Sequence, residues 1–268
     1  MIDLSIVIVS FNARADLERC LSSLNQSPPD TSHEIIVVDN ASTDQSAQAA
    51  RAWPDVHVIE SATNRGFAAA NNAGIRQGTG RTVLLLNSDT IVPPGALDRL
   101  LAELDRHPDA AAIGPRLIDG DGRAELSFGS MMAPWTEFRR RRLMRGLETG
   151  DLAARSQVEA MTREARSPDW VSGACLLVRR ADAEAVGLLD ERYFMYTEDV
   201  DFCAALRGRG RRVLFTPAVE VVHLRGRSAA TAPAATRAAY RRSHLAFYQK
   251  HHPVLAPIVR LYHWLRPL

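Results

Sequence analysis

The sequence predicts an α/β protein built on a mostly parallel central sheet that is flanked by helices. Short strand-like runs alternate with helical patterns through the first half of the chain. The strand-like runs are continuously apolar, which is typical of strands covered on both faces. With 268 residues the chain is long enough to bury a substantial core. Together these observations favour one large α/β domain with helices on both sides of its sheet.

The first half contains four strand–helix units in succession. The strands are expected at Leu4 to Val9, Ile35 to Val38, Val56 to Ile59 and Thr82 to Leu86. The helices are expected at Asp16 to Gln26, Asp44 to Trp53, Phe67 to Gln77 and Pro93 to about His107. Ser42 or Thr43 is the expected N-cap of the second helix, and Pro93-Pro94 is expected to open the fourth. This order implies parallel strands joined by helical crossovers.

The second half is less regular. Residues 128–168 are polar, arginine-rich and weakly periodic, and we interpret them as a variable insertion or lid. The patterns further predict a strand at Trp170 to Val178, a helix at Asp199 to Arg209, short strands at Arg212 to Phe215 and Val219 to Val222, and a basic helix at Ala234 to His251. We therefore expect a domain spanning 1–230 with a basic helical C-terminal extension at 231–268.

Composition excludes several classes of protein. The net charge of +2 gives no reason to expect a nucleic-acid partner. The three cysteines are widely spaced in apolar surroundings, so we expect buried thiols in a reducing compartment rather than disulfides or a zinc site. The chain opens on a strand pattern without a basic leader, and no apolar run approaches the ~20 residues of a membrane span. A cytoplasmic location is therefore expected.

Two acidic clusters are the strongest functional signals. Asn87-Ser88-Asp89 follows a buried strand, and Glu198-Asp199 follows an aromatic segment. An acid at the carboxyl end of a parallel strand lies where open α/β sheets bind ligands. Asp89 is therefore a candidate ligand for Mg²⁺ or Mn²⁺ on a phosphate, although it could instead cap the next helix. The second cluster is placed to take a proton, although acids at a helix start also interact favourably with the helix dipole.

Three further positions carry weaker signals. Asp39 follows a strand and could accept hydrogen bonds from a base or a ribose, or could cap the next helix. His223 follows a strand and could complete a metal site, with Arg225 or Arg227 near phosphate, or could be a packing residue. Gly173 interrupts a strand pattern, which indicates a bulge, the close approach of a ligand, or tight packing of a neighbouring strand.

Familiar nucleotide and hydrolase motifs are missing from the sequence. No Gly-x-Gly-x-x-Gly follows the first strand, and there is no Walker A loop, so binding of a dinucleotide or hydrolysis of a nucleoside triphosphate is not expected. The absence of a Gly-x-Ser-x-Gly elbow argues against an α/β-hydrolase.

Taken together, the chain resembles inverting glycosyltransferases of family 2, which have the GT-A fold of nucleotide-diphospho-sugar transferases. The resemblance runs from Ser5 to about His251 and is weakest at 128–168. It rests on seven segments in the family's order: Ser5 to Asn12, Val38 to Asp44, Asn64 to Phe67 with Asn71 to Gly74, Leu86 to Asp89, Trp170 to Ala174, Thr197 to Asp201, and His223 with Gly226 and Ser228.

The resemblance implies a role for each matching residue. Asp199 matches the catalytic base, with Glu198 beside it, and Asp89 and His223 match metal-ligand positions for Mg²⁺ or Mn²⁺. The residues implied in binding the nucleotide sugar are Ser10, Asn12, Asp39, Asn64, Asn71, Ser88 and Gly173. Asn87 stands where the family's Asp-x-Asp motif usually has its first acid, which leaves the metal with fewer charged ligands.

The implied reaction is the attack of an acceptor hydroxyl on the anomeric carbon of a nucleotide-diphosphate sugar, in one step with inversion. Within the family the chain is most similar to a bacterial rhamnosyltransferase-like group that builds cell-surface polysaccharide. That similarity implies dTDP-L-rhamnose as donor and a lipid-diphosphate-linked sugar or glycan as acceptor. The residue 128–168 insertion would then shape the acceptor site.

Two alternative functions stay open at this point. A nucleotidyltransferase that makes the sugar nucleotide would share an α/β nucleotide fold, but such enzymes usually have a glycine-rich, basic N-terminal loop. Here the first strand leads into Ser10-Phe11-Asn12-Ala13, and only Arg14 is basic. A non-catalytic glycosyltransferase-like binding module would not need an intact Asp89, Asp199 and His223.

The C-terminal third predicts peripheral association with the anionic inner face of the cell membrane. The helix from Arg237 to His251 interleaves basic and aromatic residues, and the tail beyond Pro253 adds aliphatic residues, tryptophan and more arginine. This composition is typical of an interfacial segment. The alternatives are that the tail packs on the domain or forms a homodimer contact.

Overall fold

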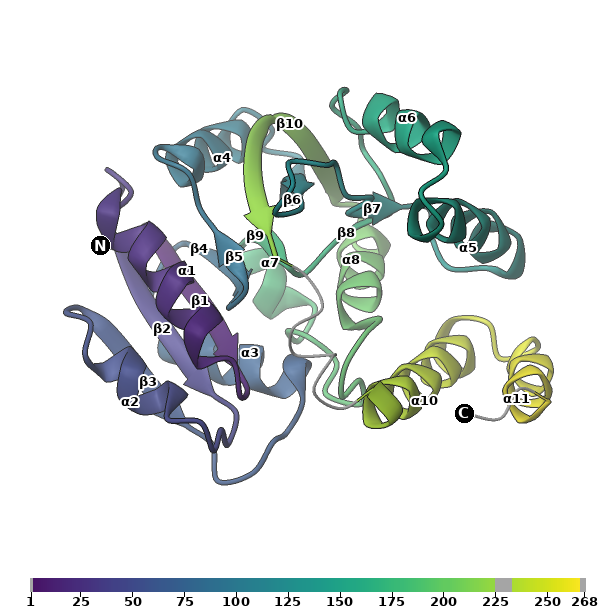
Figure 1. Ribbon diagram of the computed structural model, residues 1–268, viewed down its shortest axis with the longest axis horizontal. Coiled ribbons are helices and arrows are strands. Elements are labelled where there is room, and N and C mark those ends of the chain that lie inside the picture. The colour runs from purple at the N-terminus through teal and green to yellow at the C-terminus, as the bar shows by residue number, and fades with distance from the viewer. Residues whose placement is uncertain (1, 225–232, 266–268) are drawn as a thin grey trace.

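The computed structural model describes residues 2–224 and 233–265. Within them, an eight-stranded sheet with the order β3-β2-β1-β4-β9-β6-β10-β5 forms the centre of the molecule (Figure 1). Its strands are β1 (Leu4–Ser10), β2 (His33–Asp39), β3 (Val56–Glu60), β4 (Thr82–Asn87), β5 (Thr90–Ile91), β6 (Ala110–Ile118), β9 (Cys175–Arg179) and β10 (Arg212–His223). A separate two-stranded ribbon pairs β7 (Phe128–Gly129) with β8 (Trp170–Val171).

The pairing confirms the predicted mostly parallel sheet. Strands β1 to β4 are parallel neighbours, and β10 runs parallel to β6. Strand β9 lies antiparallel between β4 and β6, and β5 lies antiparallel to β10 at the edge. Because β9 runs in the opposite direction, its beginning lies at the same edge as the carboxyl ends of β1, β2 and β4.

Helices cover both faces of the sheet, as predicted. On one face, α1 (Arg14–Gln26), α2 (Ser46–Arg51) and α4 (Ala96–Asp105) share an apolar cluster with Ile6 and Ile8 of β1. On the other face, α3 (Phe67–Gln77), α7 (Arg180–Ala185) and α8 (Glu198–Gly208) share a second cluster with Val7. Successive β1 side chains enter opposite clusters, which explains the continuously apolar run.

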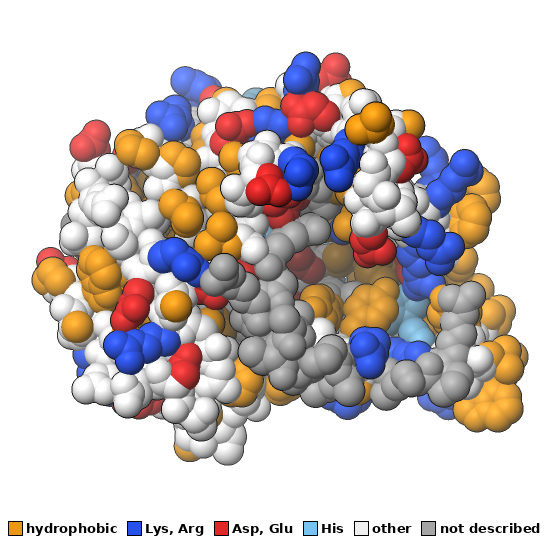
Figure 2. Space-filling model, viewed as in Figure 1, with side chains coloured by type: hydrophobic (Ala, Val, Ile, Leu, Met, Phe, Trp, Pro, Cys, Tyr) orange, Lys and Arg blue, Asp and Glu red, His pale blue; other side chains and the backbone are white. Residues whose placement is uncertain are grey.

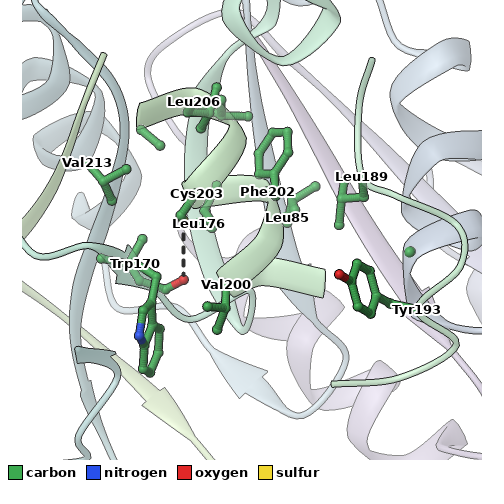
Figure 3. Close-up of a cluster of buried hydrophobic side chains, with 14 of the residues drawn as sticks. Leu85, Trp170, Leu176, Leu189, Tyr193, Val200, Phe202, Cys203, Leu206 and Val213 are labelled. Atoms are coloured by element: carbon green, nitrogen blue, oxygen red, sulfur yellow. Dashed lines mark hydrogen bonds between the residues drawn. The ribbon is translucent and has the colours of Figure 1, made fainter. Parts of the chain in front are cut away.

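Helix α8 is held by its buried face, which positions the acidic residues at its start. Figure 3 shows Phe202, Cys203 and Leu206 within the cluster that also contains Leu85 and Leu176. The Cys203 Sγ atom lies 3.9 Å from the carbonyl oxygen of Val171. All three cysteines are free and buried, as predicted, and burial raises the pKa of the Cys203 thiol to about 12.

The predicted insertion forms two helices, α5 (Pro134–Glu148) and α6 (Leu152–Met161). They pack on the core through Leu143, Met144, Leu147 and Val158. The C-terminal part forms α10 (Pro233–His251) and α11 (Ala256–Trp264), and α10 buries Phe247 and Tyr248 completely in the same core. This segment therefore packs on the domain, and the predicted boundary at residue 230 lies outside the described residues.

Local differences from the predicted elements have physical causes. The expected strand Trp170 to Val178 is broken at 172–174 into β8 and β9, because the backbone there turns toward the N-terminus of α8. The two short strands predicted after Arg212 are one strand, β10, with an irregularity between Thr216 and Glu220. Pro217 lies in this irregularity, and a proline within a sheet is confined to edges and bulges.

Helix α2 begins at Ser46 after Gln45, so neither Ser42 nor Thr43 is its N-cap.

Candidate active site

The strand register brings the predicted polar residues to one edge of the sheet. Ser10 at the end of β1 lies opposite Asp39 at the end of β2, and Asn87 ends β4 opposite Val9. The Asn87 N–H donates to the Ala174 carbonyl at 2.9 Å, which attaches the segment before β9 to the same edge. The carboxyl edge of a parallel sheet is where α/β proteins bind ligands.

A cleft of about 1380 Å³ lies over this edge (Figure 2). Its opposite wall comes from α5, α6 and α10. Seven of the predicted site residues line it: Asn64, Ser88, Asp89, Gly173, Glu198, Asp199 and His223. The other four predicted positions, Ser10, Asn12, Asp39 and Asn71, do not belong to the lining.

The Asp199 carboxylate is held at the cleft by two backbone donors. The Gly173 N–H donates to Asp199 Oδ2 at 3.0 Å, and the Val200 N–H donates to Oδ1 at 2.8 Å. Burial raises the pKa of Asp199, while these two N–H groups and the positive charge of Arg140 oppose the rise. The carboxylate is thus oriented and partly desolvated, as a general base requires.

Glu198 is buried more deeply than its neighbour, with 6% of its surface exposed. Burial and the adjacent Asp199 charge both raise the pKa of Glu198. Its Oε2 atom has no hydrogen-bond partner among the described residues. The two carboxyls therefore occupy different environments, and Asp199 has the backbone donors that stabilise its ionised form.

The backbone that leads into this acidic pair is strained. Tyr196 and Thr197 have φ angles of 69° and 67°, in the left-handed region that side chains with a Cβ rarely adopt. Just before them, the Phe194 carbonyl accepts the Phe67 N–H at 2.7 Å and lies against Gly66, where a Cβ would come within 2.3 Å of it. Strained residues of this kind cluster at functional sites.

A second group at the cleft is centred on His223. The pairing of β5 with β10 places His223 Nε2 3.3 Å from Asp89 Oδ1, and Asn87 Nδ2 lies 3.3 Å from the same nitrogen. On the other side of the ring, Nδ1 lies 3.1 Å from Glu125 Oε2. Burial lowers the pKa of His223, but the hydrogen bonds and charges of Asp89 and Glu125 outweigh it and raise the pKa to about 9.

The donor set of this group fits a divalent cation. One carboxylate and one imidazole nitrogen converge, and a second carboxylate holds the far side of the ring, as is usual for metal-binding histidines. In the described part of the chain, no cluster of three or more His, Cys, Asp or Glu side chains is arranged to hold a metal. A cation here would therefore depend on Asp89, His223 and the phosphates of a substrate, which Mg²⁺ commonly does.

The other predicted positions shape the loops behind the cleft. Asp39 Oδ2 accepts the Ser42 N–H at 2.9 Å, and Asn12 Oδ1 accepts the Thr43 N–H at 2.8 Å. Ser10 Oγ and Asp39 Oδ1 are buried without a hydrogen-bond partner among the described residues. These two atoms lie on neighbouring strand ends and are suited to a hydroxyl or amide of a ligand, because unpaired buried polar atoms are costly.

Asn64 and Asn71 differ in position. Asn64 Oδ1 accepts hydrogen bonds from Asn40 Nδ2 at 2.8 Å and from the Gly66 N–H at 2.9 Å, which fixes the loop before α3. Asn71 is buried inside α3, where its Nδ2 donates to the Phe67 carbonyl at 2.9 Å. Arg225 and Arg227, which the sequence places near phosphate, lie outside the described residues.

Residues 5–165 match the family model described as glycosyl transferase family 2. Along 93% of its length, the chain is also 32% identical to N-acetylglucosaminyl-diphospho-decaprenol L-rhamnosyltransferase of Mycobacterium tuberculosis (strain ATCC 25618 / H37Rv), of which it covers 85%. The chain belongs to glycosyltransferase family 2. The family resemblance inferred from the motifs is therefore confirmed, and the nucleotidyltransferase and binding-module alternatives lose their basis.

Solved structures confirm the GT-A fold of this glycosyltransferase. The mannosyltransferase PcManGT from Pyrobaculum calidifontis, in complex with GDP-Man and Mn²⁺, aligns with a TM-score of 0.64 and 19% identity over 96% of this chain and 68% of its own. GalNAc-T7 with UDP, GalNAc and Mn²⁺ aligns with a TM-score of 0.61 and 17% identity, over 83% of this chain and 43% of its own.

Two cleft residues of this glycosyltransferase escaped the sequence analysis, Glu125 and Arg140. Glu125 contacts His223, yet it follows a turn and no sequence motif lies beside it. The Glu125 N–H donates to the Leu117 carbonyl at 2.9 Å, which holds Glu125 beside the end of β6. Arg140 lies over the Trp170 ring at 4.5 Å from the ring centre. The run of four arginines at 139–142 was visible in the sequence, but nothing in it indicated that Arg140 would be the one whose charge acts on Asp199.

Proposed function

We propose that the protein transfers a sugar, with inversion, from a nucleotide-diphosphate donor to a hydroxyl of a lipid-linked acceptor in cell-surface glycan synthesis. The observation that carries this proposal is that one cleft holds both an oriented carboxylate, Asp199, and a separate carboxylate–imidazole pair, Asp89 and His223. The first suits removal of a proton from an acceptor, and the second suits the charge of a leaving diphosphate.

The proposed reaction is a single displacement. The acceptor oxygen forms a bond to the anomeric carbon while the bond from that carbon to the diphosphate oxygen breaks and its electron pair leaves with the nucleoside diphosphate. Asp199 receives the proton of the acceptor hydroxyl, and the N–H groups of Gly173 and Val200 keep its carboxylate in place. A divalent cation held by Asp89 and His223 would neutralise charge on the departing group.

For the donor we propose dTDP-L-rhamnose. The M. tuberculosis relative named above is a rhamnosyltransferase, which supports the sugar. The solved relatives contain GDP-Man and UDP, so the GT-A fold accommodates more than one base. In this chain the base and ribose would lie near Ser10 and Asp39, whose Oγ and Oδ1 atoms have no other partner among the described residues.

For the acceptor we propose a sugar linked through a diphosphate to a lipid at the cytoplasmic face of the membrane. The wall of the cleft formed by α5 and α10 is cationic and includes Arg139, Arg140, Arg142 and Arg242. Arg140 lies over the Trp170 ring, and its positive charge acts to lower the pKa of Asp199. An anionic diphosphate suits this wall, because arginine binds phosphate with charge-assisted hydrogen bonds. The M. tuberculosis relative is named for a diphospho-decaprenol-linked acceptor.

A donor panel tests the proposal. Purified protein is incubated with Mn²⁺, a set of nucleotide sugars and a short-chain lipid-diphosphate-linked N-acetylglucosamine, and release of nucleoside diphosphate is measured. We expect release to be fastest with dTDP-L-rhamnose and to depend on the acceptor. The same sugar as a neutral glycoside should be a poorer acceptor by at least about tenfold, since it lacks the diphosphate. Release of pyrophosphate from a triphosphate, or no release with any donor, would refute the proposal.

A further inference from the structure

Two helices that are far apart in the sequence expose apolar side chains at one end of the molecule. On α5, the side chains of Trp135 and Phe138 are 67% and 60% exposed, and their rings are stacked with centres 6.1 Å apart. Arg139 and Arg142 follow at helical spacing on the same stripe. The outer face of a helix on a water-soluble domain is normally polar, so this stripe requires an explanation.

The second exposed stripe belongs to α11 and the residue pair before it. Three of its members recur at intervals of three and four residues and so share one face, Ile258, Leu261 and Leu265, and Val254 is exposed in the turn before the helix. Trp264 lies beside them and is 76% exposed. The opposite face of α11 packs Ala256 and Val259 into the core. The helix therefore has two apolar faces, one packed on the core and one directed to solvent.

The two stripes account for most of the exposed apolar bulk in the described residues. Ten large apolar side chains are exposed there, and seven of them belong to these stripes: Trp135, Phe138, Val254, Ile258, Leu261, Trp264 and Leu265. Apolar side chains scattered singly need no explanation, whereas a concentration of them marks an interaction site. Figure 1 shows α5 and α11 at the same end of the molecule, and Figure 2 shows apolar and basic side chains mixed there.

Side-chain contacts hold the two helices in a fixed relation. Arg141 Nη1 of α5 donates to the Tyr262 hydroxyl of α11 at 2.7 Å. Glu137 of α5 lies 2.8 Å from His244 Nε2 of α10, and His244 Nδ1 lies 3.0 Å from His263 Nε2 of α11. Since His244 is almost completely buried, its contacts with Glu137 and His263 are largely shielded from solvent, whereas the contact between Arg141 and Tyr262 is exposed. The stripes are therefore two parts of one preformed surface.

The charges around this surface are predominantly positive. Arg139, Arg142 and Arg145 on α5 and Arg260 on α11 have no acidic ion-pair partner within residues 2–224 and 233–265. Exposed tryptophan, phenylalanine and aliphatic side chains bordered by arginine form the composition that binds the interface of an anionic bilayer. A protein partner with an apolar surface would not by itself require these unpaired arginines.

We propose that α5 and α11 together form a docking face for an anionic membrane surface. Trp135, Phe138 and the α11 stripe would enter the headgroup region, and the arginines would meet lipid phosphates. The aromatic residues Phe247 and Tyr248 of α10 are buried, so of the C-terminal segment that the sequence indicated only the part beyond Pro253 belongs to the docking face. This docking proposal depends on the proposed function at one point, which is that docking is useful to an enzyme whose acceptor is attached to a lipid.

The docking face borders the cleft. Arg139 and Arg142 belong to the exposed stripe of α5 and also line the cleft that contains Asp199. A sugar attached to a lipid diphosphate could then reach the catalytic acids while its lipid stays in the bilayer. The insertion at 128–168 would thus contribute to membrane docking as well as form one wall of the acceptor site.

Vesicle co-sedimentation tests the docking face with two double variants, one for each helix, and one single variant as a control. The vesicles contain phosphatidylcholine and phosphatidylglycerol in about equal amounts, or phosphatidylcholine alone. The α5 variant is Trp135→Ser with Phe138→Ser, and the α11 variant is Ile258→Ser with Leu261→Ser. Leu152→Ser is the control, because Leu152 is 74% exposed but lies outside both stripes. Each double variant should lower the partition coefficient at least about tenfold, and the control should change it by less than about twofold.

A charge variant and the oligomeric state complete the test. Arg139→Gln with Arg142→Gln should weaken binding to the anionic vesicles by about fivefold per arginine and leave binding to phosphatidylcholine little changed. Wild-type protein that does not pellet at low salt, or an α5 variant that pellets as well as wild type, would overturn the proposal. A wild-type dimer that the α5 variant dissociates would assign the face to a subunit contact instead. Transfer to a water-soluble acceptor, measured separately, shows whether the transferase function stands regardless of docking.

Discussion

Replacing Asp199 with Asn should lower turnover by at least about 100-fold and leave nucleoside-diphosphate affinity almost unchanged. The amide has nearly the same shape and still accepts the hydrogen bond from the Gly173 N–H, but it cannot take the proton of the acceptor hydroxyl. Steady-state kinetics with saturating donor and acceptor measure the turnover, and calorimetric titration with dTDP measures the affinity. Turnover close to that of wild type would remove Asp199 from the role of base.

Glu198→Gln is the matched control, since Glu198 precedes Asp199 and lies in the same cleft but lacks the hydrogen bond to Gly173. We expect a loss of less than about tenfold. The pH profile separates the two variants further. Burial raises the pKa of Asp199, and a base acts in its deprotonated form, so wild-type activity should fall as the pH drops through this raised pKa. This acidic limb should persist in Glu198→Gln and disappear from the residual activity of Asp199→Asn.

Removal of divalent cations should weaken nucleoside-diphosphate binding at least about tenfold, because without the cation the carboxylates of Asp89 and Glu125 offset the charge of His223 and leave no net positive charge for a diphosphate. Titration with dTDP in the presence of Mn²⁺ or of EDTA measures the difference directly, without turnover. Asp89→Asn should reduce the Mn²⁺ dependence of binding to a similar degree. Equal affinities with Mn²⁺ and with EDTA would contradict the assignment of Asp89 and His223.

Glu125→Gln tests the same site through the ring nitrogen of His223 that does not face Asp89. Glu125 contacts His223 Nδ1 at 3.1 Å and would not touch the cation. Partners of this kind orient a metal-binding histidine, and their loss typically costs about 10–100-fold in metal affinity. The Mn²⁺ affinity of the nucleotide complex should fall in that range, while the thermal unfolding temperature stays within a few degrees. An unchanged Mn²⁺ affinity would mean that Glu125 only packs beside the ring.

The sequence predicts the N-terminal half of the fold because its patterns are local. The runs that became β1, β2 and β4 are continuously apolar, and α3 occupies residues 67–77 as its small and apolar residues indicated. Strand β6 escaped prediction because it begins with three alanines and contains Gly114 and Pro115, which have low strand propensity. Its conformation is set by β9 and β10 on either side, and a Cβ at Gly114 would come within 2.9 Å of Val171.

The candidate site also contains residues with a local sequence signal and residues that only tertiary contacts place. Asp89, Asp199 and His223 were recognisable because each stands at the end or beginning of a regular element. Glu125 and Arg140 depend on tertiary contacts that leave no local trace in the sequence. The interleaved aromatic and basic residues of α10 fit either a membrane interface or a packed helix, and only the burial of Phe247 decides between them. The apolar stripe of α5 was hidden within a segment dominated by arginine.

The anomeric configuration of the product is the most direct test of a single displacement assisted by Asp199. Transfer from dTDP-L-rhamnose to the diphosphate-linked acceptor is followed by proton NMR from the first turnovers. We predict a glycosidic bond with the anomeric configuration opposite to that of the donor, because the acceptor hydroxyl attacks from the face away from the departing diphosphate. A product with the configuration of the donor would require two displacements and would contradict the account.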